Sequence, residues 1–282
     1  MGLVIRPMHR SDVDGGLRLC RLAGWDQVER DWRRFIDGPG SGGYAAVQAN
    51  DLMATIATVR YGRQFGWIGM VLVHPDAQGR GIGSVMVTKA IDTLSDMPAV
   101  RLDATPAGRV LYQKHGFVDE YPLTRLEAMA VNVDDEPSTM VRPMTRGELP
   151  AVIAMDQGIF GAPRAEILHW MYDGAPEFAF VAERQGNLSG YVFGRHGHQF
   201  EHVGPLVADE GSVAMDMMKA CLAQHRDRAF VIDAPHHDDR WIRFLEQIGF
   251  WPQRGFVRMS RGRPGPFGRP DQQFAVLGPE LG

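Results

Sequence analysis

The first half of the chain contains short hydrophobic stretches with two periods, the alternation typical of strands and the three-to-four-residue spacing typical of helices. Polar turn signals separate these stretches, including the hairpin signal Asn50-Asp51. This order of strands, crossover helix, strand and helix predicts a mixed sheet with helices on both faces. The expected helices are 11–22, 27–37, 84–94 and 106–114, and the expected strands are 44–48, 52–61, 67–73 and 100–105.

The second half repeats the pattern of the first. The segment 4–8 (VIRPM) recurs at 140–144 (MVRPM), and Gly116-Phe117 recurs at Gly249-Phe250. Between these landmarks, Asp103 at the end of one strand recurs as Asp233. Three landmarks in the same order and at nearly constant spacing indicate an internal duplication. The second copy has expected helices at 151–160, 165–172 and 216–225 and expected strands at 178–183 and 189–195.

The duplication predicts an α+β protein with α/β-like layers, built from two tandem folds. Each fold is expected to hold a mixed, mainly antiparallel sheet flanked by helices. The expected boundaries are 1–131 for the first domain, 132–138 for an acidic linker and 139–262 for the second domain. The tail 263–282 is rich in glycine and proline and is expected to pack on the surface.

Composition limits the possible partners. The 282 residues are 44% hydrophobic, which suits two full cores, and the net charge of −4 argues against a nonspecific nucleic-acid partner. No apolar run in the sequence approaches 18 residues, so no membrane partner is expected. Cys20 and Cys221 are too few for a disulfide framework, and their apolar helical contexts predict buried thiols. Without a signal-peptide core at the N-terminus, the protein is expected to be soluble and cytoplasmic.

The segment 71–84 carries the most informative chemistry. An apolar strand leads into Gln78-Gly79-Arg80-Gly81-Ile82-Gly83, and an expected helix comes next. Glycines at alternate positions let backbone N–H groups point to one spot, where the helix N-terminus adds its dipole, and this geometry suits a pyrophosphate. A P-loop requires a lysine at its end, and this loop has none. A dinucleotide-binding fingerprint requires a further glycine where this loop has Ser84, but Asp103 lies about 20 residues on, where that fingerprint has an acidic residue. For the loop alone, dinucleotide binding and a turn that binds nothing therefore both stay open.

A second motif lies downstream, at Leu111-Tyr112-Gln113-Lys114-His115-Gly116-Phe117. Together the two segments resemble the Gln/Arg-x-x-Gly-x-Gly/Ala and Leu-Tyr-x-x-x-Gly-Phe motifs of the GCN5-related N-acetyltransferases (GNAT), in that family's order. The resemblance implies two tandem acyl-CoA N-acyltransferase folds. It also implies that the domain 1–131 uses acetyl-CoA as co-substrate, with no metal.

The resemblance also implies residue roles. In the family, the end of the fourth strand pairs with the pantetheine, the glycine loop binds the pyrophosphate, and the tyrosine protonates the departing thiolate. Tyr112 is therefore the implied general acid for direct attack of a primary amine in a ternary complex. Thr105 stands where many relatives carry an asparagine that touches the pantetheine, and it reaches less far. The implied donor contacts are Val71, Leu72, Val73, Gln78, Gly79, Arg80, Gly81, Ile82, Gly83, Ser84, Thr105 and Tyr112.

The acceptor pocket of the family borders the segment after the first helix. There Trp25, Asp26, Glu29 and Trp32 would form an aromatic and acidic wall that favours a cationic amine, with Asp26 as a candidate general base. The alternative for the same pattern is a solvated helix face with two core tryptophans. The expected acceptor is a small-molecule or peptide amine.

The second half lacks this chemistry. At the position of the glycine loop it has 207–212 (VADEGS), whose two acids would repel a pyrophosphate, and Leu245 replaces the tyrosine. This pattern resembles bacterial tandem acetyltransferases with a degenerate C-terminal domain. We expect that domain to bind no CoA and to close one side of the first domain's acceptor site, presenting Asp156, Arg195 and His236. The chain is expected to be a monomer (a pseudo-dimer of domains) or a homodimer.

Two alternatives remain. An acyl-CoA-binding sensor or scaffold without transferase activity would explain the degenerate half, although a sensor has no need of Tyr112. A metal site in the second half is the other alternative, but its histidines follow no recognised ligand spacing, and surface positions are expected instead. These histidines are His196, His198, His202, His236 and His237.

Overall fold

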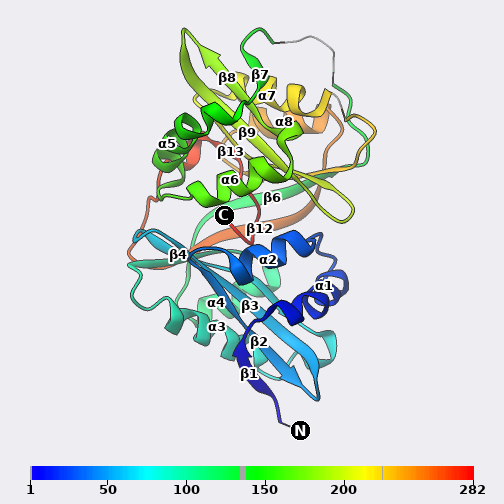
Figure 1. Ribbon diagram of the computed structural model, residues 1–282, viewed down its shortest axis with the longest axis vertical. Coiled ribbons are helices and arrows are strands. Elements are labelled where there is room, and N and C mark those ends of the chain that lie inside the picture. The colour runs from blue at the N-terminus through cyan, green and yellow to red at the C-terminus, as the bar shows by residue number, and fades with distance from the viewer. Residues whose placement is uncertain (1, 134–137, 224) are drawn as a thin grey trace. The chain divides into compact units, whose positions relative to one another are not determined.

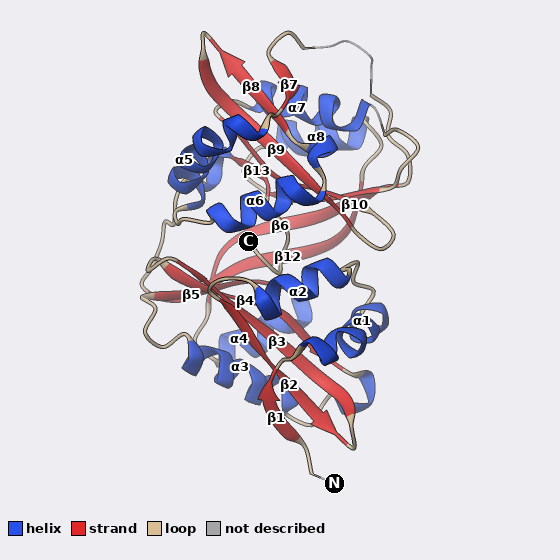
Figure 2. Ribbon diagram, in the orientation of Figure 1, coloured by secondary structure: helices blue, strands red, loops and turns tan. Residues whose placement is uncertain are grey.

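The computed structural model describes residues 2–133, 138–223 and 225–282 (Figure 1). The chain forms two compact units, each assembled from more than one segment. Unit 1 comprises Met1–Glu120, Arg258–Pro264 and Glu280–Gly282, and unit 2 comprises Tyr121–Val257 and Gly265–Pro279. Each unit combines a sheet with helices, which confirms the predicted α+β architecture (Figure 2).

Unit 1 holds a mixed sheet. Its elements, with 3₁₀ helices written η, are β1 (Val4–Pro7), η1 (Arg10–Asp12), α1 (Val13–Leu22), α2 (Glu29–Asp37), β2 (Ser41–Gln48), β3 (Asp51–Tyr61), β4 (Phe65–Val73), η2 (Pro75–Ala77), α3 (Ile82–Thr93), β5 (Ala99–Ala104) and α4 (Pro106–Lys114). Antiparallel pairs join β1 through β4, and β5 runs parallel to β4. The last part of β12 (Trp251–Gly262) comes after β5 in the strand order.

Unit 2 repeats this order of elements. They are β7 (Val141–Pro143), η3 (Arg146–Glu148), α5 (Leu149–Phe160), α6 (Ala165–Gly174), η4 (Pro176–Phe178), β8 (Phe180–Arg184), β9 (Asn187–His196), β10 (Glu201–Ala208), α7 (Gly211–Ala223), β11 (Phe230–Pro235), α8 (Asp239–Gln247), η5 (Pro270–Gln272) and β13 (Gln273–Ala275). The strands β7 through β10 pair in antiparallel fashion, and β10 and β11 are parallel. Most of β6 (Val118–Ala128) pairs with β11 in antiparallel fashion.

The sequence repeat has a structural counterpart at the start of each half. In unit 1, Arg6 forms a bidentate ion pair with Asp12, with N–O distances of 2.7 Å. In unit 2, Arg142 pairs in the same way with Glu148. Both carboxylates also accept a backbone N–H at the start of a 3₁₀ helix, so each strand is tied to the helix after it.

The two halves of the sequence exchange their last strands, which the predicted boundaries at 131 and 139 do not anticipate. Residues 123–128 of β6 pair with β11 in unit 2, whereas residues 258–262 of β12 belong to unit 1. Two buried ion pairs mark the exchange, Arg125–Asp233 in unit 2 and Arg258–Asp103 in unit 1. Within the predicted linker 132–138, residues 134–137 lie outside the described residues.

The predicted position of the tail on the surface is wrong. Its residues 273–275 form β13, which adds to β10 in unit 2, and the Phe274 and Leu277 side chains are buried. Leu281 is buried in unit 1. The glycine and proline content suggested a surface layer, but the apolar side chains between those residues supply contacts for two cores.

Two expectations from composition can be compared with the structure. Both cysteines are buried free thiols, as predicted, and burial raises the pKa of each to about 12, so neither is a thiolate at neutral pH. Within the described residues, no helix is long and apolar enough to span a bilayer.

Candidate active site

The strands β4 and β5 of unit 1 separate along their length. They pair only at Gly66 with Val100 and at Trp67 with Arg101, although β4 continues to Val73. A bulge causes the separation, because the register of β4 against β3 shifts and Met70 adopts a φ of +51°. Among the described residues, no strand pairs with this edge of β4 beyond the bulge. Its backbone groups over 71–73 therefore form an edge suited to an extended ligand.

The predicted phosphate loop has the backbone that its sequence requires. Gly79 and Gly81 have φ values of +73° and +79°, in the left-handed region. A Cβ atom at either position would meet no atom within 4 Å, so the conformation, not crowding, calls for glycine here. Gly81 is the N-cap of α3, and in the described chain no side chain caps this helix start. The first N–H groups of α3 and the helix dipole are thus directed at the loop.

Two polar side chains of the loop lie on the surface. Gln78 donates a hydrogen bond of 3.2 Å to the Val73 carbonyl oxygen, which ties the loop to the end of β4. Arg80 is exposed and makes a long contact of 3.4 Å with the Gln48 amide oxygen. Arg80 therefore keeps the freedom to reach an anion held by the loop.

The helix α4 carries Tyr112, whose side chain is buried. The Thr105 hydroxyl oxygen accepts a hydrogen bond from the Gly108 N–H and caps this helix. Tyr112 packs edge-to-face on Phe117, with ring centroids 5.9 Å apart. Burial raises the pKa of Tyr112 above its ordinary value of 10.0, because the phenolate would lose its hydration. The phenol is therefore a proton donor over the whole neutral range.

Gly83 marks the point where β4, α3 and α4 meet. A Cβ atom built on Gly83 would lie 3.7 Å from Val73 and 3.5 Å from Leu111, the neighbour of Tyr112. At the next residue, the Ser84 hydroxyl lies 2.8 Å from His115 Nε2 at the end of α4. The structure thus brings together the strand end, the glycine loop and the tyrosine helix, which the sequence analysis assigned to one site.

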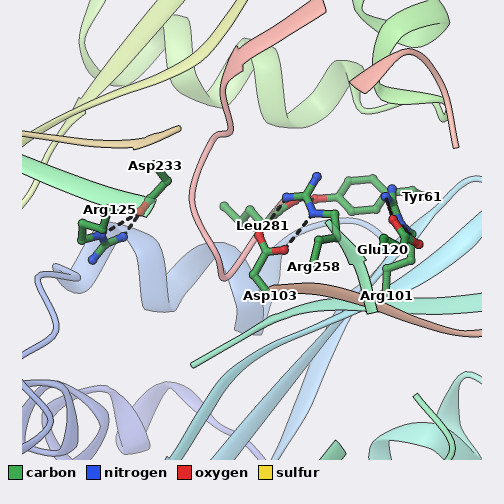
Figure 3. A network of polar contacts seen from close by, with 8 residues as sticks. All are labelled: Tyr61, Arg101, Asp103, Glu120, Arg125, Asp233, Arg258 and Leu281. Carbon is green, nitrogen blue, oxygen red and sulfur yellow. Dashed lines mark hydrogen bonds and ion pairs between the residues drawn. The ribbon is translucent and has the colours of Figure 1, made fainter. Parts of the chain in front are cut away.

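A buried polar cluster lies in unit 1 near the point where β4 and β5 separate, which we call the strand fork (Figure 3). The sequence did not reveal this cluster. The Arg258 guanidinium forms two hydrogen bonds with Asp103, of 2.8 and 2.7 Å, and lies 4.8 Å from the centre of the Trp67 ring. Arg101 approaches the same ring and pairs with Glu120. Asp103 is therefore held as a structural brace. Its partner was missed because Arg258 lies 155 residues away in the sequence.

The last residues of the chain cover the face of β4 next to the bulge. The Tyr61 hydroxyl donates a hydrogen bond to the Leu281 carbonyl oxygen (Figure 3). A Cβ atom on Gly69 would lie 2.3 Å from the Glu280 carbonyl oxygen, so only glycine fits there. Glu280 is itself 2% exposed. The segment 280–282 is thus part of the site's surroundings, and no motif in the sequence indicated it.

The four residues of the predicted acceptor wall lie in different environments. Trp32 is fully buried against Gly16, so it is a core side chain, and its assignment to the wall is wrong. Glu29 is exposed and pairs with Arg33 one turn later, as on a solvated helix face. Asp26 is buried and Trp25 is half-buried, and these two remain candidates.

Unit 2 retains the shape of the strand fork but fills it with its own chain. The strand β10 has a register shift between Val203 and Leu206, like the bulge of β4. Beyond it, β13 pairs with β10, and the Val276 N–H donates to the Asp233 carbonyl oxygen of β11. Leu245, at the position of Tyr112, is completely buried. The backbone edge that stays open in unit 1 is thus occupied in unit 2.

Of the three residues suggested for a second-half contribution to the acceptor site, Asp156 and Arg195 are buried in unit 2, whereas His236 is exposed. Asp156 is 1% exposed and forms a bidentate ion pair with Arg164, and Tyr191 donates a hydrogen bond to it. Arg195 is equally buried, beside His202. Burial of His202 also corrects its predicted surface position. Among the described residues, no group of three or more metal-binding side chains is arranged around a common point.

Comparison with known proteins places both halves in one family. The model of the acetyltransferase (GNAT) family matches residues 17–117, and the model of an acetyltransferase (GNAT) domain matches residues 152–275. The chain is 30% identical over 259 residues to holothin acyltransferase of Pseudoalteromonas sp. (strain SANK 73390), covering 92% of this chain and 87% of that protein. It is 28% identical over 249 residues to the uncharacterized N-acetyltransferase YitH of Bacillus subtilis (strain 168), covering 86% of each. A provisionally assigned acetyltransferase from Pyrococcus horikoshii has the same fold, with a TM-score of 0.80, 21% identity and coverage of 100% and 96%.

Proposed function

The chain belongs to the GNAT family of N-acetyltransferases as a tandem member, and from that premise we propose that unit 1 transfers an acetyl group from acetyl-CoA to a primary amine. The observation that carries this proposal is the open edge of β4 lying next to the glycine loop and the tyrosine helix. Unit 2 has no equivalent open edge among its described residues, so we assign the chemistry to unit 1 alone.

The donor fits the fork as an added strand. The backbone of Val71, Leu72 and Val73 would pair with the pantetheine arm, in the way that an extended peptide adds to a sheet edge. The N–H groups at the start of α3, together with those of the loop from Gly79, would bind the pyrophosphate. Arg80 would add charge at the rim.

The bulge gives unit 1 a means to stabilise the reaction. A backbone N–H released from the sheet near Met70 would donate to the thioester oxygen as negative charge develops on it. Removing one such donor from an enzyme typically lowers the rate about 10²- to 10³-fold. Tyr112 would then protonate the departing thiolate; burial raises the pKa of Tyr112, so the phenol still carries its proton at neutral pH.

The acceptor amine must lose a proton before or during attack, because an alkyl ammonium has a pKa of about 10.4. Asp26 is the candidate base in the segment that precedes α2, and it is buried. Attack then forms the new C–N bond while the C–S bond breaks. The sulfur takes the proton that Tyr112 supplies, and the proton released by the new amide nitrogen returns the Tyr112 phenolate to the phenol. The relative named holothin acyltransferase makes holothin one acceptor to test.

The proposal is tested by titrating the purified full-length chain with CoA and acetyl-CoA in a calorimeter. We expect one site per chain, and we expect a Gly81→Glu variant to lose binding, because a carboxylate would enter the phosphate position. Gly186→Glu, at another left-handed glycine with open space in unit 2, is the matched control and should bind normally. Equal binding by wild type and Gly81→Glu would contradict the proposed donor site.

Thiol release from acetyl-CoA then separates an enzyme from a sensor. A panel of small amines, polyamines, amino acids, peptides and holothin should contain at least one acceptor that accelerates release. Binding without release across the whole panel would favour the acyl-CoA sensor instead.

A further inference from the structure

A row of polar side chains begins next to the glycine loop of unit 1 and ends on β12, a strand from the other half of the sequence. Its first member is Ser84, in the first turn of α3, and its hydroxyl contacts His115 Nε2 at 2.8 Å. His115 lies at the end of α4 and is followed by Gly116, which has a φ of +80°. The turn at Gly116 brings the backbone against Arg261 of β12, whose Nε lies 3.6 Å from the position of a Gly116 Cβ.

Arg261 is available for a ligand. Its side chain is exposed, and within the described part of the chain it forms no ion pair. The nearest buried cation on the same strand, Arg258, is by contrast held by Asp103. That pair fixes β12 beside β5, so Arg261 has a defined position although its guanidinium is exposed.

The surroundings of Arg261 suit an anion. Burial lowers the pKa of the His115 imidazole, and the nearby positive charge of Arg261 lowers it further. On the other side of Ser84 lies the start of α3, where the helix dipole is positive.

We propose that Arg261, a residue from the second half of the sequence, binds a phosphate group of the acyl-CoA donor of unit 1, with Ser84 and His115 completing the site. This inference rests on the proposed function and deepens it. It assigns the degenerate half a direct part in donor binding, through the exchanged strand. Acyl-CoA offers two phosphate sources, the pyrophosphate and the 3′-phosphate on the ribose.

The test compares CoA with 3′-dephospho-CoA by calorimetry at low ionic strength, using the full chain and an Arg261→Ala variant. We expect the variant to bind CoA about tenfold more weakly, because a charge-assisted hydrogen bond to phosphate is lost. Arg243→Ala removes an exposed cation from α8 in unit 2 and is the matched control, with unchanged affinity. Arg261→Lys should recover part of the loss, and thermal melting of each variant verifies that it is folded.

The outcomes separate the possibilities. A loss with CoA alone assigns Arg261 to the 3′-phosphate, and an equal loss with dephospho-CoA assigns it to the pyrophosphate. A shallower salt dependence of CoA binding in Arg261→Ala supports either assignment. Unchanged binding of both ligands by Arg261→Ala, in a chain where Gly81→Glu abolishes binding, overturns this inference and leaves the proposed function standing. Absence of CoA binding by the wild-type chain would overturn both.

Discussion

Unit 1 and unit 2 share the order of their elements and the bulge in the strand that precedes the crossover helix. In unit 1 the bulged strand β4 pairs with β5 at two residue pairs, and in unit 2 the bulged strand β10 pairs with β11 at three. The units differ in how the remainder of each bulged strand is used. Beyond the residues that pair with β11, β10 pairs with β13. Beyond the residues of β4 that pair with β5, no strand in the described chain pairs with the same edge of β4.

This difference separates the part of the fold that both units share from the part that is found only in unit 1. The bulge survives in both units because it shapes the sheet, and burial of the strands on either side maintains it. Unit 2 has no counterpart of the glycine loop or of Tyr112 at the equivalent positions, and β13 pairs with the strand edge that is open in unit 1. A fork that has lost its ligand still has unpaired backbone groups, and β13 satisfies them.

After the strand exchange, each unit contains one buried ion pair between an exchanged strand and its neighbour. Breaking one of these ion pairs should have the largest effect on stability. Arg258→Ala leaves Asp103 buried without its partner, and we expect the free energy of unfolding to fall by about 3–5 kcal/mol. Arg125→Ala should cost a similar amount through Asp233. Urea denaturation of both variants provides the measurement.

Two controls sharpen this prediction. Arg33→Ala removes an exposed ion pair on α2 and should change stability by less than about 0.5 kcal/mol. Replacing both partners, Arg258→Met with Asp103→Leu, should recover most of the loss. If Arg258→Ala is as mild as Arg33→Ala, the exchanged strand does not hold unit 1 together.

The second difference between the units is Tyr112 against Leu245, and it is tested by rate. We expect Tyr112→Phe to lower kcat about 10²- to 10⁴-fold with little change in CoA affinity, because the ring is retained and the proton donor is lost. Leu245→Met, at the equivalent position in unit 2, should leave kcat unchanged. Unchanged kcat in Tyr112→Phe would assign the proton to water or to another group.

The pH profile of the wild type should agree with this role. The ascending limb of kcat/KM reflects deprotonation of the amine, whose ordinary pKa is about 10.4 for an alkyl ammonium. Burial raises the pKa of Tyr112 above 10.0, so the phenol remains protonated at higher pH than an exposed tyrosine. The profile of kcat/KM should therefore show no descending limb below pH 10. A descending limb at neutral pH would contradict Tyr112 as the acid.

The smallest expected effect concerns backbone conformation. Gly81→Ala should lower the free energy of unfolding by about 1–2 kcal/mol, because alanine is strained at a φ of +79° even with open space around its Cβ. In unit 2, Gly158→Ala lies in the helix α5 with nothing within 4 Å, and it should raise stability by about 0.5–1 kcal/mol. The same sign for both variants would show that the loop is more relaxed than its φ values indicate.

Much of the fold and the centre of the candidate site were predictable from the sequence. Alternating and helical hydrophobic patterns located most helices and strands, and the spaced glycines at 79 and 81 predicted left-handed turns at a helix start. These features depend on a few neighbouring residues, whose backbone preferences and burial are local. The acceptor wall was less predictable, because an aromatic residue such as Trp32 has the same local pattern in a core and in a pocket.

By itself, then, the sequence determined the duplicated fold, the glycine loop at a helix start, the tyrosine helix and the absence of both motifs from the second copy. Only the tertiary structure decided that the last strands are exchanged, that Arg258 braces Asp103, that β13 fills the fork of unit 2 and that Arg261 lies beside His115. Each of these contacts joins residues far apart in the chain. Backbone periodicity and turn preference act over a few residues, whereas such contacts are selected by how complete units bury charge and satisfy backbone hydrogen bonds.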